Sequence, residues 1–319
     1  MSSRNFGSRV GLCCIVFAAA AVSCFAVRHH IQEDGPALYT YTVVNSYPHD
    51  PDAFTQGLLY YSNDTFYESA GLYGESTLRH VDLVTGNVLK RVGNEPRDFA
   101  EGLALSQDRL VQLTWRSPKG ILYDRESFEV IESFRTQLKD GWGLTNEHED
   151  SHELIATDSG SKLFYLDAET FETKRTVQVT DNGVPVPWLN ELEWIDGEIW
   201  ANIWQTECIA RINPETGEVN GWILMHGLRQ SLMERRIPQR KSMDVLNGIA
   251  WDPHRRRLFL TGKLWPRLYE VQVRRITWPP DINLAEARRL CIKQRSIASA
   301  KKLSPHRLDS VAAALDLFT

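Results

Sequence analysis

A short motif that returns five times is the feature of this chain that most constrains its fold. Its copies are FTQGL, FAEGL, GWGLT, LNELE and LNGIA. Aligned on Gly57, Gly102, Gly143, Glu191 and Gly248, they are separated by steps of 45, 41, 48 and 57 residues. A period in the forties with strand-like content is typical of the blades of a β-propeller.

Each repeat has the residue pattern of several short antiparallel strands. The strand at the motif is followed by an apolar second strand, such as RLVQLTW, and by a third that ends in a turn, such as YLDAETF. An Asp or Asn at that turn can bond its own backbone, and four repeats carry one: Asp82, Asp124, Asp167 and Asn213. With a fourth strand in each repeat, the pattern predicts an all-β, five-bladed β-propeller over residues 36–273. The regular period argues against a β-sandwich.

The two ends of the repeat array are expected to meet. The last repeat has only three strands of its own, ending at PRLYEVQV, and residues 40–50 before the first repeat are expected to supply the missing outer strand. This pairing leaves no open edge in the ring. The longest step contains residues 227–245, a polar, basic stretch that predicts a loop with one helical turn over a face of the propeller.

Residues 1–35 are expected to be a cytoplasmic stub, a signal peptide or signal anchor, and a linker. Arg4 and Arg9 precede 18 uncharged residues, 10–27, which is a basic region followed by an apolar one. A cleaved signal or a type II anchor in the ER or Golgi membrane would place the body in the secretory lumen or outside the cell. No other membrane contact is expected. Asn63, in the sequon NDT, is then a candidate glycosylation site.

Residues 274–319 are expected to form a basic, partly helical tail outside the propeller, with one amphipathic helix over 284–299. The tail carries nine Lys or Arg and four Asp or Glu, whereas residues 30–273 have a net charge of −13. The acidic body argues against nucleic-acid binding, which needs clustered cations. Beyond residue 24 only Cys208 and Cys291 remain, so no disulfide framework is expected, and Cys208 is interpreted as a small buried apolar side chain.

Candidate site residues follow from the repeat register. The first strand of each propeller blade lines the central channel, so equivalent residues should meet at one height. The residues just before the aligned positions are Gln56, Glu101, Trp142, Asn190 and Asn247. The second strands are expected to end at Glu68, Trp115, Asp158, Trp204 and Lys263. If both sets face one end of the channel, Trp115, Trp142 and Trp204 would wall one pocket. Its few polar contacts would come from Gln56, Glu101, Asn190 and Lys263, as is typical of a small-ligand site.

These segments together resemble the plant-type glutaminyl-peptide cyclotransferases, or glutaminyl cyclases. The resemblance covers residues 40–273 and is carried by FTQGL, YESAGLYGESTLR, FAEGL, LVQLTW, GWGLT, LNELE, IWANIWQT, DVLNGIAWDP and TGKLWPRLYEV. It implies a five-bladed propeller that converts the N-terminal glutamine of peptides and proteins into pyroglutamate with loss of ammonia, without a catalytic metal or other cofactor. The expected partners are therefore peptides that begin with glutamine, and we expect a monomer.

The resemblance also implies which residues form the pocket. The candidate catalytic residues are Glu101, Lys263 and Asn190. The candidate substrate-binding residues are Phe54, Gln56, Phe99, Trp115, Trp142 and Trp204.

Ring closure of a glutamine calls for residues of these types. The α-amine attacks the side-chain amide carbon of the same residue, and one carboxylate can take the amine proton and then protonate the departing ammonia. Glu101 suits this role, because desolvation between aromatic rings raises the pKa of a carboxyl group. Lys263, an indole N–H or the Asn190 amide could hold the oxyanion. Gln56 or Asn190 could instead hold the scissile amide.

Two other functions are compatible with a propeller of this kind. In a metal-dependent hydrolase such as a lactonase, Glu101, Asn190 and Asn247 would bind a hard cation through oxygen, although none of the channel positions is an Asp. A non-catalytic binding propeller would have no need of Glu101 in its channel. Activity that survives strong chelation would reject the hydrolase, and ammonia release from a glutamine-initiated peptide would reject the scaffold.

Overall fold

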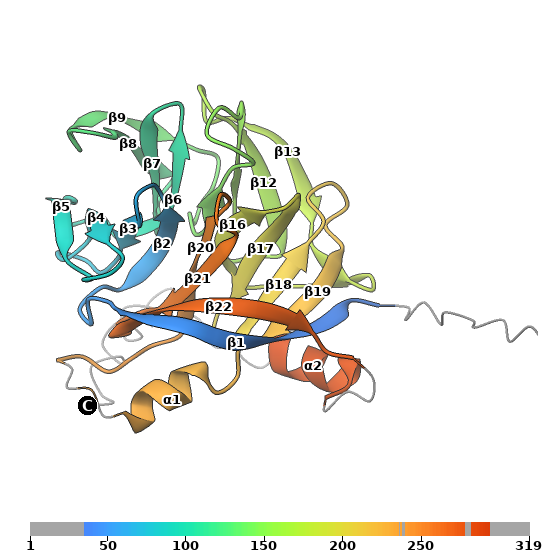
Figure 1. Ribbon diagram of the computed structural model, residues 1–319. Helices are drawn as coiled ribbons and strands as arrows, with labels where there is room; N and C mark the ends of the chain where they lie inside the picture. Colours follow the sequence, from blue (N-terminus) through green and yellow to red (C-terminus); the bar gives the residue numbers. More distant parts are fainter. Residues whose placement is uncertain (1–34, 236, 238–239, 278–281, 294–319) are drawn as a thin grey trace, which may run out of the picture. The chain divides into compact units, whose positions relative to one another are not determined.

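The computed structural model describes residues 35–235, 237, 240–277 and 282–293. The predicted targeting segment therefore lies outside the described residues, as does the chain after residue 293. In the described part the fold is all-β, with strands β1 to β22 and the short helices α1 and α2 (Figure 1). No helix in this part is long and apolar enough to cross a membrane.

The first three repeats each form a separate antiparallel sheet of four strands. The first sheet contains β2 (Thr55–Tyr60), β3 (Thr65–Ala70), β4 (Thr77–Asp82) and β5 (Val88–Gly93). The second contains β6 (Ala100–Ser106), β7 (Arg109–Thr114), β8 (Lys119–Asp124) and β9 (Val130–Arg135). The third contains β10 (Leu144–Thr145), β11 (Glu153–Ala156), β12 (Lys162–Asp167) and β13 (Thr173–Gln178). A small ribbon follows, made of β14 (Thr180–Asp181) and β15 (Val184–Pro185).

The last two repeats share one sheet of eight strands, ordered β16-β17-β18-β19-β1-β22-β21-β20. The fourth repeat supplies β16 (Leu189–Ile195), β17 (Glu198–Ile203), β18 (Cys208–Ile212) and β19 (Val219–Leu224). The fifth supplies β20 (Leu246–Asp252), β21 (Arg257–Gly262) and β22 (Arg267–Arg275), and β1 (Ala37–Pro48) completes it.

Strand β1 joins the two ends of the chain, as Figure 1 shows. It pairs antiparallel with β22, from Tyr39 opposite Arg275 to Pro48 opposite Arg267, so the predicted outer strand is confirmed. Its first residues also pair in parallel with β19, beginning with Ala37. That second pairing was not predicted. It is possible because β1 has 12 residues and extends beyond the shorter strand that a single repeat needs.

The repeated glycines allow the first strands of neighbouring repeats to approach each other backbone to backbone. A Cβ atom added at Gly102 would lie 2.4 Å from the carbonyl oxygen of Trp142. One added at Gly143 would lie 2.0 Å from the carbonyl oxygen of Asn190, and Gly57 is similarly crowded. Real Cβ contacts are never this short, so only glycine fits at these positions.

Glu191 occupies the aligned position in the fourth repeat and bridges the first strands in another way. Its buried carboxylate accepts the backbone N–H of Leu58 at 3.3 Å and that of Ile249 at 2.9 Å. On the same strand, Glu193 accepts the N–H of Trp251 at 2.8 Å. Burial, and for Glu191 also the charge of Glu193, raises the pKa of both carboxyl groups. The first strands of the first, fourth and fifth repeats therefore meet at one carboxylate.

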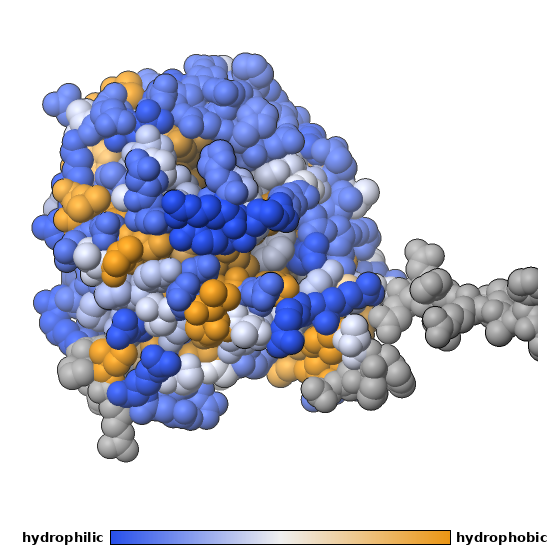
Figure 2. Space-filling model, viewed as in Figure 1, coloured by the Kyte–Doolittle hydropathy of each residue, from blue (hydrophilic) through white to orange (hydrophobic). Residues whose placement is uncertain are grey.

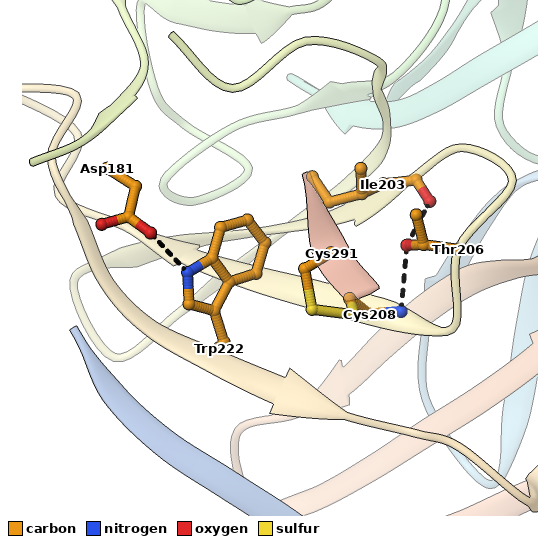
Figure 3. The surroundings of a disulfide bond; sticks show 6 residues. All are labelled: Asp181, Ile203, Thr206, Cys208, Trp222 and Cys291. Carbon is orange, nitrogen blue, oxygen red and sulfur yellow. Dashed lines mark hydrogen bonds between the residues drawn. A yellow bond between two sulfur atoms is a disulfide. The ribbon is translucent and has the colours of Figure 1, made fainter. Parts of the chain in front are cut away.

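A disulfide joins Cys208 of β18 to Cys291, with their Cα atoms 5.5 Å apart (Figure 3). The expectation of no disulfide, with Cys208 as a free buried side chain, is therefore wrong. The two cysteines are 83 residues apart, and nothing in that spacing signals that the helix α2 (Leu284–Cys291) packs back onto the fourth repeat.

Polar contacts also hold α2 in place. Arg288 donates from Nε to Asp181 Oδ2 at 2.9 Å and forms a second bond to the same carboxylate. The buried indole N–H of Trp222 donates to Asp181 at 2.9 Å (Figure 3). The described part of the tail thus packs on the outer strands, with Ala287 and Cys291 buried. The helix predicted over 284–299 ends at Cys291, because Ile292 is already extended.

The insert over 227–245 contains the predicted helical turn as α1 (Leu228–Glu234). After it, Lys241 pairs with Glu75 at 2.7 Å and Arg240 pairs with Asp52 at 3.2 Å, so the insert contacts the first repeat. The face of the molecule in Figure 2 is mainly hydrophilic and interrupted by separate hydrophobic patches.

Candidate functional site

Polar side chains from three first strands form one buried chain of hydrogen bonds. Gln56 donates from Nε2 to Glu101 Oε1 at 3.1 Å. Asn247 donates from Nδ2 to the Oε1 atom of Gln56 at 3.3 Å and to the carbonyl oxygen of Thr55 at 2.9 Å. Glu101 and Gln56 are each 3% exposed, and Asn247 is fully buried. The repeat register therefore brings the first, second and fifth repeats together at Gln56, which bonds both Glu101 and Asn247.

Glu101 and Lys263 are two buried ionisable side chains whose charges each influence the pKa of the other. Burial raises the pKa of Glu101 well above its ordinary value, the Lys263 ammonium opposes this increase, and the nearby Asp140 carboxylate adds to it. Burial also lowers the pKa of Lys263, against the pull of Glu101 and Asp244. The Lys263 Nζ atom lies 4.9 Å from the ring centroid of Phe54. Burial thus disfavours the charged form of both side chains, and each charge partly offsets the effect of burial on the other.

A first aromatic wall stands beside this pair. Phe99 contacts Phe54 edge-on, with centroids 6.0 Å apart, and Trp115 at 5.2 Å. Tyr73 packs against Phe99 at 5.3 Å and Trp115 at 6.3 Å, and is 53% exposed. Because Tyr73 is partly open to solvent and Phe99 is buried, the wall runs from the interior to the mouth of the site.

A second aromatic wall consists of three tryptophans. Trp142 and Trp204 meet edge-on at 5.6 Å, and Trp188 lies 6.4 Å from Trp142 and 5.3 Å from Trp204. Trp142 is buried and the other two are partly exposed. Of the three tryptophans expected to wall one pocket, Trp142 and Trp204 lie together, whereas Trp115 packs against Phe99 in the first wall.

Asp140 lies between the two walls. Its Oδ1 accepts the backbone N–H of Arg116 at 3.0 Å, and its Oδ2 accepts the Ser159 hydroxyl at 3.3 Å. Burial raises the pKa of Asp140, whereas these donors and the nearby Trp142 indole lower it. Because Asp140 also raises the pKa of Glu101, this one carboxylate links the second wall to the buried pair.

Two polar atoms near the second wall have no hydrogen-bond partner of normal geometry in the described part of the chain. They are the Oδ1 atom of Asn190 and the indole Nε1 of Trp142, both buried. Asn190 sits on the first strand of the fourth repeat, next to Gly143. Buried polar atoms of this kind are rare and are free to bond a ligand.

The structure places Glu68 away from the site. The second strand of the first repeat, β3, ends at Ala70, and the N–H of Gly71 bonds the carbonyl oxygen of Phe54 as Trp115 bonds Phe99. The position equivalent to Trp115 is therefore Gly71. Because glycine has no side chain, nothing in the sequence indicated that the second strand ends there rather than at Glu68. Glu68 instead contacts His49. Within the described residues, no three His, Cys, Asp or Glu side chains are grouped closely enough to hold a metal ion.

Comparison with known proteins decides the family. A family profile described as glutamine cyclotransferase matches residues 16–273. The chain belongs to the glutamine cyclotransferase family. A glutaminyl-peptide cyclotransferase of Arabidopsis thaliana is 47% identical over 234 residues, or 73% of this chain and 71% of the relative. The crystal structure of Myxococcus xanthus glutaminyl cyclase matches with a TM-score of 0.67 and 35% identity, over 76% of this chain and 100% of that chain.

This glutamine cyclotransferase family member also contains site residues that the sequence analysis missed. Trp188 was detectable, because Phe54, Phe99 and Trp188 each stand two residues before a polar channel residue. Tyr73 and Asp140 lie in loops without a repeating signal. The match to the family ends at Val273, so α2 and the disulfide partner Cys291 lie beyond it.

Proposed function

We propose that this protein is a glutaminyl-peptide cyclotransferase, which converts the N-terminal glutamine of peptides and proteins into pyroglutamate with release of ammonia. The family membership supports this activity, as do the names of the two relatives. The observation that carries the proposal is the buried Glu101, bonded to Gln56, together with the buried Lys263 next to the Phe54 ring of the first aromatic wall. That arrangement suits a short, uncharged side chain whose amide nitrogen must gain a proton while the α-amine of the same residue loses one.

In this proposal Glu101 moves the proton. Its carboxylate accepts a proton from the substrate α-amine, whose nitrogen attacks the side-chain amide carbon. A carbon–nitrogen bond forms to close the ring, and the proton passes to the amide nitrogen, which departs as ammonia. A raised pKa allows one carboxyl group to act first as base and then as acid. The aromatic walls hold the substrate in a conformation that is ready to cyclise.

The remaining polar groups divide between donors and acceptors. The ammonium of Lys263 and the indole N–H of Trp142 are donors, so we assign the oxyanion of the tetrahedral intermediate to one of them. The open atom of Asn190 is an acceptor, which suits an N–H of the substrate amide. Phe54, Phe99, Trp115 and Trp204 would contact the substrate through their rings.

The finer architecture proposed is a five-bladed β-propeller. Three separate sheets and the two halves of the eight-stranded sheet supply five groups of four strands. The close approach of Gly102 to Trp142 and of Gly143 to Asn190, with the carboxylate of Glu191 shared among three first strands, supports convergence of the groups on one axis.

We propose further that the body lies in the secretory lumen or outside the cell, is glycosylated and is monomeric. The disulfide between Cys208 and Cys291 supports an oxidising compartment. Asn63 is exposed in the tight turn between β2 and β3, where a glycan can attach. Treatment of the protein, isolated from its own secretory pathway, with an N-glycosidase should reduce its mass. Asn63→Gln should remove that shift, and an unchanged mass in both would contradict glycosylation.

Ammonia release from a short glutamine-initiated peptide, such as Gln-Ala amide, tests the activity. We expect stoichiometric loss of ammonia and of the free amine, in the presence or absence of a strong chelator. Loss of turnover on chelation would favour a metal-dependent hydrolase. No turnover of any glutamine-initiated peptide would favour a binding protein.

A further inference from the structure

The second strands of four repeats end in the same local conformation. In each, a residue at the site bonds back to the first strand, as Trp204 N–H does to the carbonyl oxygen of Trp188 at 2.9 Å. The residue that follows has a left-handed backbone. These following residues are Leu72 (φ 94°), Arg116 (φ 51°), Gln205 (φ 61°) and Leu264 (φ 62°). Of these four residues Leu264 is buried, whereas Arg116 and Gln205 are exposed, and only Arg116 is charged.

The Arg116 side chain lies over a site residue and has no acidic partner. Its guanidinium carbon is 4.2 Å from the ring centroid of Trp115. The residue is exposed, and in the described part of the chain its guanidinium makes no ion pair, unlike the exposed Arg256, which pairs with Asp196 at 2.6 Å. The stacked guanidinium thus keeps its hydrogen-bond donors available to a ligand.

Asp140 holds the backbone of Arg116 in place, but among the described residues its carboxylate forms no ion pair with the Arg116 guanidinium. The carboxylate binds the backbone N–H of Arg116, and its other oxygen accepts from Ser159. Both oxygens are therefore bonded to groups other than the Arg116 guanidinium, and Asp140 is a positioning residue. Tyr73 also contacts Trp115, and the Arg116 charge lowers the pKa of Tyr73, against the larger effect of burial.

We propose that Arg116 is a specificity-determining residue that binds an acidic side chain at the position after the N-terminal glutamine. This inference rests on the proposed function. With the glutamine held between the aromatic walls, the chain must leave past the exposed rim. One residue spans only about 3.3–3.6 Å, so the second residue emerges where Tyr73 and Arg116 stand. A guanidinium matches a carboxylate in a two-bond geometry that neutral side chains do not offer.

The test compares peptides that differ only in one charge. The kcat/KM values for Gln-Glu-Ala amide and Gln-Gln-Ala amide are measured with the wild type, with Arg116→Gln and with the matched control Arg256→Gln, which removes the same charge from the β20–β21 turn. The acidic peptide should be preferred about 2- to 5-fold, as expected for one partly exposed ion pair. The preference should reside in KM, weaken with salt, and disappear in Arg116→Gln but persist in Arg256→Gln.

Each outcome separates this inference from the proposed function. Turnover of the Gln-Gln peptide without a preference for Gln-Glu would overturn the role of Arg116 and leave the cyclase activity established. A preference that persists in Arg116→Gln would overturn it as well. Asp140→Asn, which retains an acceptor for the Arg116 N–H, should keep the preference. Absence of turnover of every peptide would instead contradict the proposed function.

Discussion

At the scale of single residues, the site depends on the proton held by Glu101. Glu101→Gln keeps the size and the contact to Gln56 but cannot accept a proton from the substrate amine. Turnover of Gln-Ala amide should fall by about 10²–10⁴, the usual contribution of a general acid–base group. Glu193→Gln is the matched control, because it alters another buried carboxyl on a first strand, β16, that accepts a backbone N–H. Near-normal turnover in a folded Glu101→Gln protein would mean that another residue is the general base.

The pH dependence of activity should report the coupling between Glu101 and Lys263. Because Glu101 must be ionised to act as a base, kcat/KM should rise with pH through its raised pKa. The Lys263 ammonium lowers that pKa, so Lys263→Met should shift the acidic limb to higher pH as well as slow the reaction. The substrate amine titrates identically with both proteins and cancels in the comparison. An unshifted limb would mean that the two side chains do not interact.

The sequence predicted which residues meet at the site only at positions that recur in every repeat. The contact between Gln56 and Glu101 follows from the register of the first strands. Tyr73 and Asp140 come from loops, which have no period to reveal which residues meet in space. Glu68 was misplaced because the strand end it was thought to mark is Gly71, which has no side chain to signal the position.

At the scale of elements, a buried ion pair links the closing strand to the first repeat. His49 follows β1, and its Nδ1 lies 2.7 Å from the Trp265 carbonyl oxygen while its Nε2 lies 3.0 Å from Glu68 Oε1. Burial lowers the pKa of His49, but the Glu68 carboxylate outweighs it and the net shift is upward. Burial raises the pKa of Glu68, but His49 and Arg79 bring it down to about 2.

This pair predicts how stability varies with pH. The stability that the ionised Glu68 contributes is fully present above pH 4.5 and is lost as the pH falls towards its pKa of about 2. The contribution of His49 is complete below 6.5 and is lost as pH rises through its raised pKa. His49→Gln should therefore lower the free energy of unfolding most between pH 4.5 and pH 6.5, by about 3–5 kcal/mol, as expected when a buried ion pair is broken. Urea unfolding across pH measures it, with the exposed His226→Gln as control. A pH-independent difference would show that His49 is neutral.

The disulfide predicts a second effect on an element. Cys208→Ala with Cys291→Ala should lower the free energy of unfolding by about 2–5 kcal/mol, because the bond closes a long loop. Activity at room temperature should change little, since the site lies on the first and second strands. Thermal unfolding with and without a reductant measures the effect. The same melting temperature for both proteins under oxidising conditions would contradict a stabilising role.

Strand order was predictable from the sequence to the extent that each element has a local pattern. The pairing of β1 with β22 could be inferred because the last repeat lacked one strand. The bond between Cys208 and Cys291 could not be inferred, because it depends on where α2 packs. The sequence of a basic amphipathic helix does not indicate which surface of the body it will pack against. The parallel contact of β1 with β19 depends only on strand length.

At the scale of the whole described body, the first strands of the repeats must converge for the site to form. Gly143→Ala tests this requirement, because the added methyl group would meet the Asn190 carbonyl oxygen at 2.0 Å, against backbone that has no rotamer to change. We expect a loss of at least about 1–3 kcal/mol, the usual cost of overpacking, together with lower turnover, since Asn190 moves with its backbone. Gly93→Ala is the matched control, because its methyl group would have no neighbour within 4 Å. Chemical denaturation and ammonia release are measured on all three proteins. Equal stability of Gly143→Ala and Gly93→Ala would mean that the first strands can separate, and that the contact between Gln56 and Glu101 does not depend on their convergence.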